Sequence, residues 1–479
     1  MKKASFIIII AAFLLSGCKY RSAVESYDIF PEYDGITVPC NIAPLNFRTA
    51  FRKSAVTVQG QSGRYEFKGR RGLVSFPLKK WHEMLDAEKG NVLTVTVMPK
   101  GNEYTESDKR QLVWTISDQP IDGYLSYRLI EPAYEVWHGI QIEQRDMESF
   151  RTVLLGDNRN AGHCCMNCHT SNRAGTSFMH LRGAKGGTVL NRNGKLTKLN
   201  TRTEQTGGGV YGDISADGRY GVFTTADITF AIHSQVDLRM EVYDKRSDLV
   251  VVNFDDLTVT YNASTSGDEY QETFPCFSAD GKSIFFCRAV HHAQPDSISD
   301  MHYDIAVVQF DPETGKIGDR VITLVPAGDR LSFSHLKVSP DGRWLMATAA
   351  EYGTFPVWHK ESELWLIDLK SGKIDTLPQV NAYGADTYHS WSSNGSWVVF
   401  ASKRDDLVYG RPYIAYMGPD GTMGKPFVLP QKDPDKYRDM LKSFNIPELY
   451  TTPEVYNARD IAAFYNNVQT EQLSVRVPD

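Results

Sequence analysis

The residues whose types and spacing suit chemistry lie in one short stretch near the middle of the chain. Residues 163–169 read His-Cys-Cys-Met-Asn-Cys-His and contain the pattern Cys-x-x-Cys-His. Two thiols at this spacing can bond the two vinyl groups of one porphyrin, and the adjacent histidine can ligate its iron. The pattern therefore predicts covalent haem c held by Cys165, Cys168 and His169, in a protein that transfers electrons.

Other interpretations of the same residues stay open. The two thiols of the pattern could form a disulfide that braces a turn, or a redox dithiol, although no βαβ pattern surrounds them. A zinc site would need further ligands, for which His163, Cys164 and His180 are near enough in the chain. If haem is bound, Met179 and His180 are the nearest candidates for a second iron ligand.

Four repeats indicate the elements that must position these residues. Each repeat has an apolar residue, a serine, an Asp-Gly or Asn-Gly turn, and then a strand-like run. The turn residues are Asp217, Asp280, Asp341 and Asn394, separated by 63, 61 and 53 residues. Asp-Gly and Asn-Gly supply the positive φ that a tight hairpin needs, so each repeat predicts a hairpin. A second pair of strands follows each hairpin.

Two hairpins in series make one four-stranded blade, and blades in series make a β-propeller. Glycine-marked turns predict a fifth blade at residues 165–200, and residues 137–155 could supply outer strands of a sixth. We therefore predict a six-bladed propeller over residues 131–430. The usual Cys-x-x-Cys-His motif opens a helix, whereas this one lies where an inner strand of a blade is expected.

Aligned three residues before the shared apolar position, the repeats carry similar side chains. These are Tyr211, Phe274, His335 and Tyr388. Inner strands line the channel of a propeller, so these residues are predicted to form an amphipathic ring at the channel mouth. Such a surface suits sugars or peptides.

The regions on either side of the propeller have different patterns. Short runs such as 56–58, 93–97 and 111–116 are rich in β-formers and separated by turns, which predicts a β-sandwich-like domain over residues 35–130. In residues 431–479, apolar side chains recur at helical spacing from Tyr437 to Phe444 and predict a short helical tail. The fold class is therefore all-β with a small helical end.

The amino end has the features of an export signal. Two lysines precede an apolar run from Ala4 to Leu15, which is too short to span a bilayer. Leu-Ser-Gly-Cys at positions 15–18 resembles the lipobox of bacterial lipoproteins. We expect a signal peptide over residues 1–17, lipid on Cys18 and a tether over residues 18–34. Lys19 follows the cysteine, in place of the Asp that retains enterobacterial lipoproteins at the inner membrane. By this resemblance we expect the outer membrane, and we favour its periplasmic leaflet.

Composition limits the function classes. The chain has 479 residues, of which 23% are charged, and a net charge of −6, so nothing indicates a nucleic-acid partner. It lacks the Gly-x-Ser-x-Gly and His-Glu-x-x-His motifs of common hydrolases. We therefore expect no catalytic residues and no resident metal, and a non-enzymatic role is favoured.

The blade motifs, the lipobox and the central Cys-x-x-Cys-His occur together with three further phrases, at 41–47, 124–130 and 388–393. In this combination the chain resembles the TolB-like propeller lipoproteins of Bacteroidota, which are often labelled cytochrome c biogenesis or Tol-type proteins. The resemblance implies the propeller fold and localisation in the cell envelope. It leaves two functions open, a binding or scaffold module for a protein or glycan partner and a haem electron-transfer protein.

Overall fold

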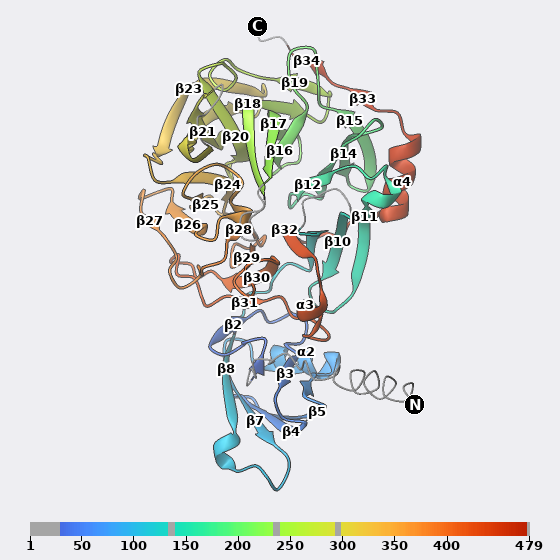
Figure 1. Cartoon of the computed structure of the whole chain (residues 1–479), viewed down its shortest axis with the longest axis vertical. Coiled ribbons are helices and arrows are strands. Elements are labelled where there is room, and N and C mark those ends of the chain that lie inside the picture. The colour runs from blue at the N-terminus through green and yellow to red at the C-terminus, as the bar shows by residue number, and fades with distance from the viewer. Residues whose placement is uncertain (1–28, 133–138, 233–239, 293–297, 477–479) are drawn as a thin grey trace, which may run out of the picture.

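The computed structural model describes residues 29–132, 139–232, 240–292 and 298–476. A smaller β-domain lies beneath a six-bladed propeller (Figure 1). The signal peptide and Cys18 lie outside the described residues. None of the described helices is long and apolar enough to cross a bilayer.

The N-terminal domain is one eight-stranded sheet. Its strands, in spatial order, are β1 (Ile29–Phe30), β3 (Phe47–Thr49), β6 (Leu73–Val74), β5 (Arg64–Arg70), β4 (Lys53–Gln59), β7 (Val92–Pro99), β8 (Arg110–Ile116) and β2 (Ile36–Val38). The three predicted strands fall within β4, β7 and β8. Helix α2 (Leu78–Ala87) packs on the sheet, and its Trp81 ring lies 5.7 Å from that of Trp114.

This arrangement corrects two expectations. The domain is a single sheet rather than two facing sheets, because α2 covers apolar surface that a second sheet would cover in a sandwich. The predicted tether is also too long, since residues 29–34 belong to the fold. Tyr33 is fully buried, its carbonyl accepts a hydrogen bond from Trp114 Nε1 at 2.8 Å, and Asp34 Oδ1 accepts one from the Val113 amide.

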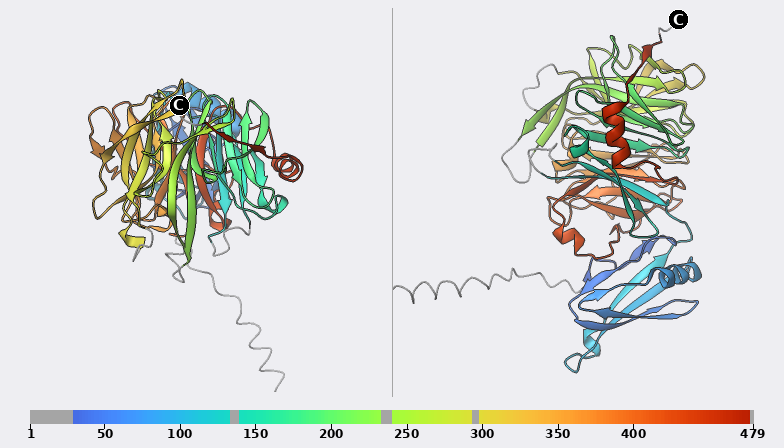
Figure 2. Two further views of the ribbon diagram at one scale, coloured as in Figure 1. Left: turned by 90° about the horizontal axis from the view of Figure 1, so that it is seen from above. Right: turned by 90° about the vertical axis from the view of Figure 1, so that its right-hand side faces the viewer.

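Six sheets surround a common channel and form the propeller, and each contains one four-stranded blade (Figures 1 and 2). With the innermost strand first, blade 1 is β32 (Ser443–Tyr450), β9 (Tyr124–Ile130), β10 (Gln141–Asp146) and β11 (Thr152–Asp157). Blade 2 is β12 (Met166–Ser171), β13 (Thr176–Leu181), β14 (Gly187–Arg192) and β15 (Lys195–Asn200). Blade 3 is β16 (Gly209–Ile214), β17 (Tyr220–Ile232), β18 (Met240–Asn253) and β19 (Thr258–Thr260).

The remaining blades follow in chain order. Blade 4 is β20 (Tyr270–Phe277), β21 (Ser283–Val290), β22 (Asp304–Asp311) and β23 (Lys316–Val325). Blade 5 is β24 (Ser332–Val338), β25 (Trp344–Ala350), β26 (Glu363–Asp368) and β27 (Ile374–Asp375). Blade 6 is β28 (Asp386–Trp391), β29 (Trp397–Ser402), β30 (Arg411–Tyr416) and β31 (Phe427–Val428). Six blades were predicted, and six are present.

The predicted hairpins form as expected and share one hydrogen-bond pattern. In the first, the Ser215 hydroxyl donates to Asp217 Oδ1 at 2.6 Å, and Gly218 has a φ of 72°. The same serine oxygen accepts from the Tyr220 amide at 2.9 Å. The equivalent bonds recur at the other three predicted turns. The repeated Ser-x-Asp-Gly pattern is therefore a turn motif that joins the inner two strands of a blade.

The propeller closes between the two ends of the chain, which corrects both predicted domain boundaries. β32 lies beyond residue 430 yet is the innermost strand of blade 1, where it pairs with β9. β9 itself begins before residue 131. The propeller therefore runs from about residue 124 and includes residues 443–450.

The C-terminal tail is only partly helical. Helix α3 (Lys436–Asp439) has four residues, so Tyr437 is helical but Phe444 lies in β32. Helix α4 (Ala458–Asn467) covers the flank of blade 1 (Figure 2). Two short strands, β33 (Glu471–Gln472) and β34 (Ser474–Val475), then extend the outer edges of blades 2 and 3. Short 3₁₀ helices occupy Glu106–Asp108, Asn158–Asn160, Ile298–Asp300 and Pro356–Trp358.

The two domains share buried contacts. One hydrophobic cluster runs from the N-terminal sheet through blade 6 and into β32. Polar contacts reinforce it. Arg48 pairs with Asp433 at 2.9 Å and Asp435 at 2.7 Å, and Asp122 Oδ2 accepts from the Ser393 amide at 2.9 Å.

Candidate ligand-binding cavity at the channel mouth

Each of the six innermost strands breaks its pairing with the second strand at the same level. At every break two residues of the inner strand oppose one of its partner, which is a β-bulge. The repeat alignment places Cys168, Tyr211, Phe274, His335, Tyr388 and Ile446 in these bulges, where Tyr211 is the second residue of its bulge and the other five are the first. All of these except Tyr211 have φ between 48° and 53°. Non-glycine residues rarely adopt this conformation, and it is often found at functional sites.

The predicted ring of Tyr211, Phe274, His335 and Tyr388 forms a continuous set of contacts. Tyr211 stacks on Phe274 with ring centroids 4.2 Å apart, and Phe274 lies 4.2 Å from His335. His335 in turn meets the edge of Tyr388 at 4.6 Å. Four neighbouring blades thus present one joined aromatic surface. The contacts bring together the four side chains that the sequence alignment placed at equivalent positions.

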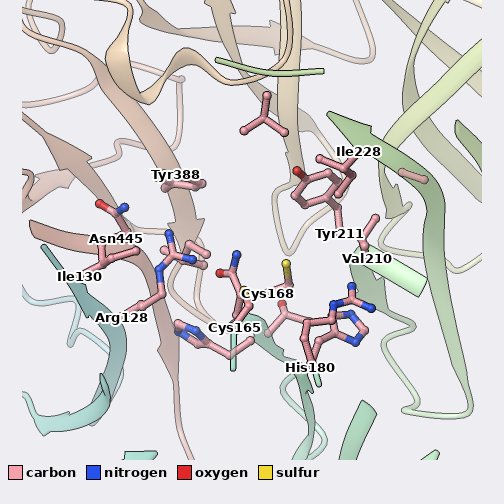
Figure 3. Close-up of a pocket in the computed structure, with 18 of the residues that line it drawn as sticks. Arg128, Ile130, Cys165, Cys168, His180, Val210, Tyr211, Ile228, Tyr388 and Asn445 are labelled. Carbon is pink, nitrogen blue, oxygen red and sulfur yellow. The ribbon is translucent and has the colours of Figure 1, made fainter. Parts of the chain in front are cut away.

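The ring lies in the wall of a cavity of about 890 Å³. Tyr388, Arg128 and Asn445 lie on one side of this cavity and Tyr211 lies on the other, with Cys168 between them (Figure 3). The long hairpin of β17 and β18 extends past the blade on one face, and its Ile228 lines the same cavity (Figures 2 and 3). The cavity is large enough for a small organic ligand.

Two residues further along the inner strands lies a set of charged side chains. Lys337 Nζ is 3.2 Å from Asp213 Oδ1 and 3.4 Å from Glu448 Oε1. It also donates to Thr170 Oγ1 at 3.2 Å. Burial alone would lower the pKa of Lys337, but the carboxylates of Glu448 and Asp213 outweigh burial and raise it. The four side chains come from four blades and join them across the channel.

The Cys-x-x-Cys-His pattern lies in β12 and just before it, as an inner strand and not a helix. Cys165 and Cys168 are free thiols that line the cavity. Burial raises the pKa of Cys165 to about 12 and also raises that of Cys168, so both are protonated near neutral pH. Within the described part of the chain, no three His, Cys, Asp or Glu side chains are grouped to hold a metal ion, so the zinc interpretation gains no support.

The histidines predicted for haem lie at the same cavity, whereas the methionine does not. Both ring nitrogens of His169 are buried, beside the backbone of Ile446 and Ser126. His180 Nδ1 bonds to Thr188 Oγ1 at 2.8 Å, and its ring lies beside the backbone of Val210. Burial lowers the pKa of each to about 3. Met179 packs in the hydrophobic core of blades 1 and 2 and does not line the cavity, so it is removed as a second ligand.

Several cavity residues were missed by reasoning from the sequence. Arg128 comes from β9 and Asn445 from β32, and these strands were assigned outside the propeller. The contact between Lys337 and Asp213, in contrast, could have been predicted from the repeat alignment. They stand two positions after His335 and Tyr211 in the repeat alignment, where opposite charges at equivalent positions indicate a contact across the channel.

Comparisons with known proteins find only distant structural similarity. No family model matches the chain, and no curated protein matches it. Among solved structures, TolB from Acinetobacter baumannii is 14% identical with a TM-score of 0.43, covering 76% of this chain and 80% of its own.

Two further structures are similar at the same level. A protein assigned as TolB from Agrobacterium tumefaciens is 15% identical with a TM-score of 0.38, covering 64% of this chain and 88% of its own. An oligogalacturonate lyase from Vibrio parahaemolyticus is 13% identical with a TM-score of 0.33, covering 59% and 85%. The chain has a six-bladed β-propeller fold, and its structural neighbours include TolB-like propellers.

Proposed function

We propose that this chain is an envelope lipoprotein that binds a glycan at the mouth of its propeller channel and does not act as a catalyst. The observation that carries the proposal is the joined aromatic surface from Tyr211 to Tyr388 in the cavity wall. Aromatic faces pack against the apolar C–H faces of sugars, and nearby amide and guanidinium groups can donate to sugar hydroxyls.

The protonation states in the cavity favour binding over catalysis. Burial is the main cause that lowers the pKa of His335 and of His389 to about 3, so both rings are neutral near pH 7. General acid–base catalysis works best when the pKa of the group lies near the working pH. Neither histidine meets that condition.

The proposal is tested by measuring glycan binding with a panel of immobilised oligosaccharides and titration calorimetry. Replacing Tyr211 and Tyr388 together by alanine should weaken binding at least tenfold, while near-UV circular dichroism confirms a packed fold. Tyr383→Ala is the matched control, because that side chain is 65% exposed and does not line the cavity. Unchanged glycan affinity in the folded double variant would contradict the proposal, as would capture of a protein partner alone.

Localisation in the cell envelope is a separate part of the proposal. Its support is the lipobox-like segment that ends at Cys18, together with Lys19 directly after it. Acyl chains on Cys18 would hold the protein on a membrane, since two or more chains give stable anchoring. We favour the outer membrane and its periplasmic leaflet, where glycans of the cell envelope are accessible.

Haem binding is the second candidate, and one observation favours it. Cys165, Cys168, His169 and His180 all line the cavity, and both histidine rings are buried there. These residues are of the types that hold haem c, and one cavity brings them together. The two thiols would hold haem covalently, His169 would ligate the iron with His180 as the second ligand, and bound haem would supply one-electron transfer.

The haem candidate is tested by making the protein with a cytochrome c maturation system. A haem-staining band that survives denaturing electrophoresis, and is lost in a Cys165→Ala, Cys168→Ala variant, is the expected result. Protein isolated from its own host without a Soret band would exclude this candidate. The same preparation, tested on the oligosaccharide panel, separates the two functions.

A further inference from the structure

Arg128 is a buried cation in the wall of the cavity. The residue is 5% exposed, and its guanidinium points into the cavity beside Asn445 and Tyr388 (Figure 3). With the Asn445 amide oriented to satisfy both groups, its oxygen accepts from Arg128 Nη2 at 3.3 Å. The Tyr388 phenol also lies close enough for the Arg128 charge to act on it. Both neighbouring groups are neutral, and Arg128 Nε has no hydrogen-bond partner.

The charge of Arg128 is not balanced by the acids around it. Among the described residues no carboxylate forms an ion pair with this guanidinium. Glu448, on the adjacent strand β32, pairs with Lys337 at 3.4 Å instead. The nearby thiols do not supply a negative charge for Arg128 either. Burial raises the pKa of Cys165 to about 12 and also raises that of Cys168, so both stay protonated near neutral pH. Burying an unpaired charge is costly, so proteins normally pair such groups or place them where an anion binds.

A second guanidinium adds to the positive potential of the same cavity. Arg182 is half-buried, lines the cavity, and donates from Nη2 to the Gly209 carbonyl at 3.0 Å. The charges of Arg128 and Arg182 both act on Cys165 and Cys168. Their fields therefore overlap at the centre of the cavity, close to the aromatic surface.

We infer that the ligand of the proposed function is an acidic sugar, whose carboxylate pairs with Arg128 while the sugar rings lie on the aromatic surface. This inference rests on the proposed glycan binding and names its chemical class. A carboxylate can accept from the terminal N–H groups of this guanidinium that face the cavity, and charge-assisted pairs of this kind are the strong ones. A neutral sugar would leave the buried charge unbalanced.

The test compares two matched ligands, a short uronic-acid oligosaccharide and the same oligosaccharide with its carboxylates methyl-esterified. Esterification removes the charge and keeps the sugar rings. The wild-type protein should bind the acid roughly 10- to 100-fold more tightly than the ester, as expected for one charged hydrogen-bonded pair. Arg128→Gln should remove that preference and leave ester binding within a few-fold of wild type.

Two controls separate recognition from folding. Arg320→Gln removes an exposed arginine on β23, outside this cavity, and should leave the preference for the acid unchanged. Arg128→Gln should also leave the melting temperature of the unliganded protein unchanged or higher, because the side chain has no ion-pair partner to lose. A large drop in that temperature would assign Arg128 a structural role and overturn the inference.

The outcomes distinguish this inference from the proposed function. Equal binding of acid and ester by the wild-type protein overturns acidic-sugar recognition but leaves glycan binding standing. This comparison uses the wild-type protein alone, so it does not depend on a variant that might fail to fold. Binding of neither, with no hit on the wider panel, overturns glycan binding itself. Displacement of the acid by acidic peptides at equal concentration assigns the cavity to a peptide and overturns the inference.

Discussion

Lys337 on blade 5 reaches Glu448 on the closing strand of blade 1, with Nζ 3.4 Å from Oε1. The two side chains stand over one hundred positions apart in sequence, and Asp213 of blade 3 completes the contact at 3.2 Å. An ion cluster that spans blades in this way fixes their relative positions at the centre of the propeller.

Removing the cation of this cluster should destabilise the fold. Lys337→Met leaves two largely buried carboxylates without their partner, which we expect to lower the free energy of unfolding by about 3 kcal/mol. Urea denaturation followed by tryptophan fluorescence measures the change. Lys316→Met, at an exposed position of β23, is the control. If the cluster is the cause, adding Glu448→Gln to Lys337→Met should cost less than Glu448→Gln alone; equal costs would contradict it.

His359 should make the stability of the fold decrease at alkaline pH. Burial alone would lower its pKa, but hydrogen bonds to Glu241 at 2.9 Å and Glu361 at 3.0 Å raise the pKa to about 9. The unfolded value is near 6.5, so the stabilisation is fully present below about pH 6.5 and is lost as pH rises through 9. The difference corresponds to about 3 kcal/mol.

Melting temperatures from pH 6 to 10 check this expectation. His359→Gln should flatten the fall between pH 7 and 9, whereas His292→Gln, at an exposed loop position, should reproduce the wild-type profile. Because Glu241 belongs to β18, the same pair holds the long β17–β18 hairpin against the turn before β26. A wild-type profile that is flat through pH 9 would show that the pair does not contribute as described.

The blades and the aromatic surface could be predicted because their causes are local. Each Asp-Gly or Asn-Gly turn specifies a hairpin through its own serine and glycine, and the spacing to the channel position is constant. The closing strand could not be predicted in this way. Phe444 continues a helical spacing from Tyr437, but without β32 blade 1 would have no innermost strand, and pairing with β9 overrides the local preference.

Arg128 illustrates the same limit at the candidate site. In the sequence it belongs to a short β-rich run that the sequence pattern assigned to the N-terminal domain. Its burial and its lack of an acidic partner arise only when β32 pairs with β9 and brings Asn445 beside it. The contact between Asp213 and Lys337 could have been predicted more easily, because these residues occupy equivalent positions in the repeats and carry opposite charges.

The closing strand should be required for folding. A chain that ends after Lys442 lacks β32, so blade 1 keeps an unpaired inner edge and the ring of bulges loses Ile446. We expect this variant to aggregate or to unfold without a cooperative transition, as measured by size-exclusion chromatography and calorimetry. A chain that ends after Thr470 lacks only β33 and β34 of the described strands and should remain folded like the full chain. A cooperative transition in the shorter variant would contradict the closure described here.

Lipid attachment at Cys18 should be separable from folding. Cys18 precedes the first described residue, Ile29, by eleven positions, and none of the contacts described above involves it. Cys18→Ala should therefore move the protein from the membrane pellet to the soluble periplasmic fraction, while its melting temperature stays that of the purified wild-type protein. Protease added to intact cells then reports the leaflet, since protection without lysis indicates the periplasmic side and cleavage indicates the surface. Continued pelleting of Cys18→Ala, in salt that strips peripheral proteins, would refute an anchor at this residue.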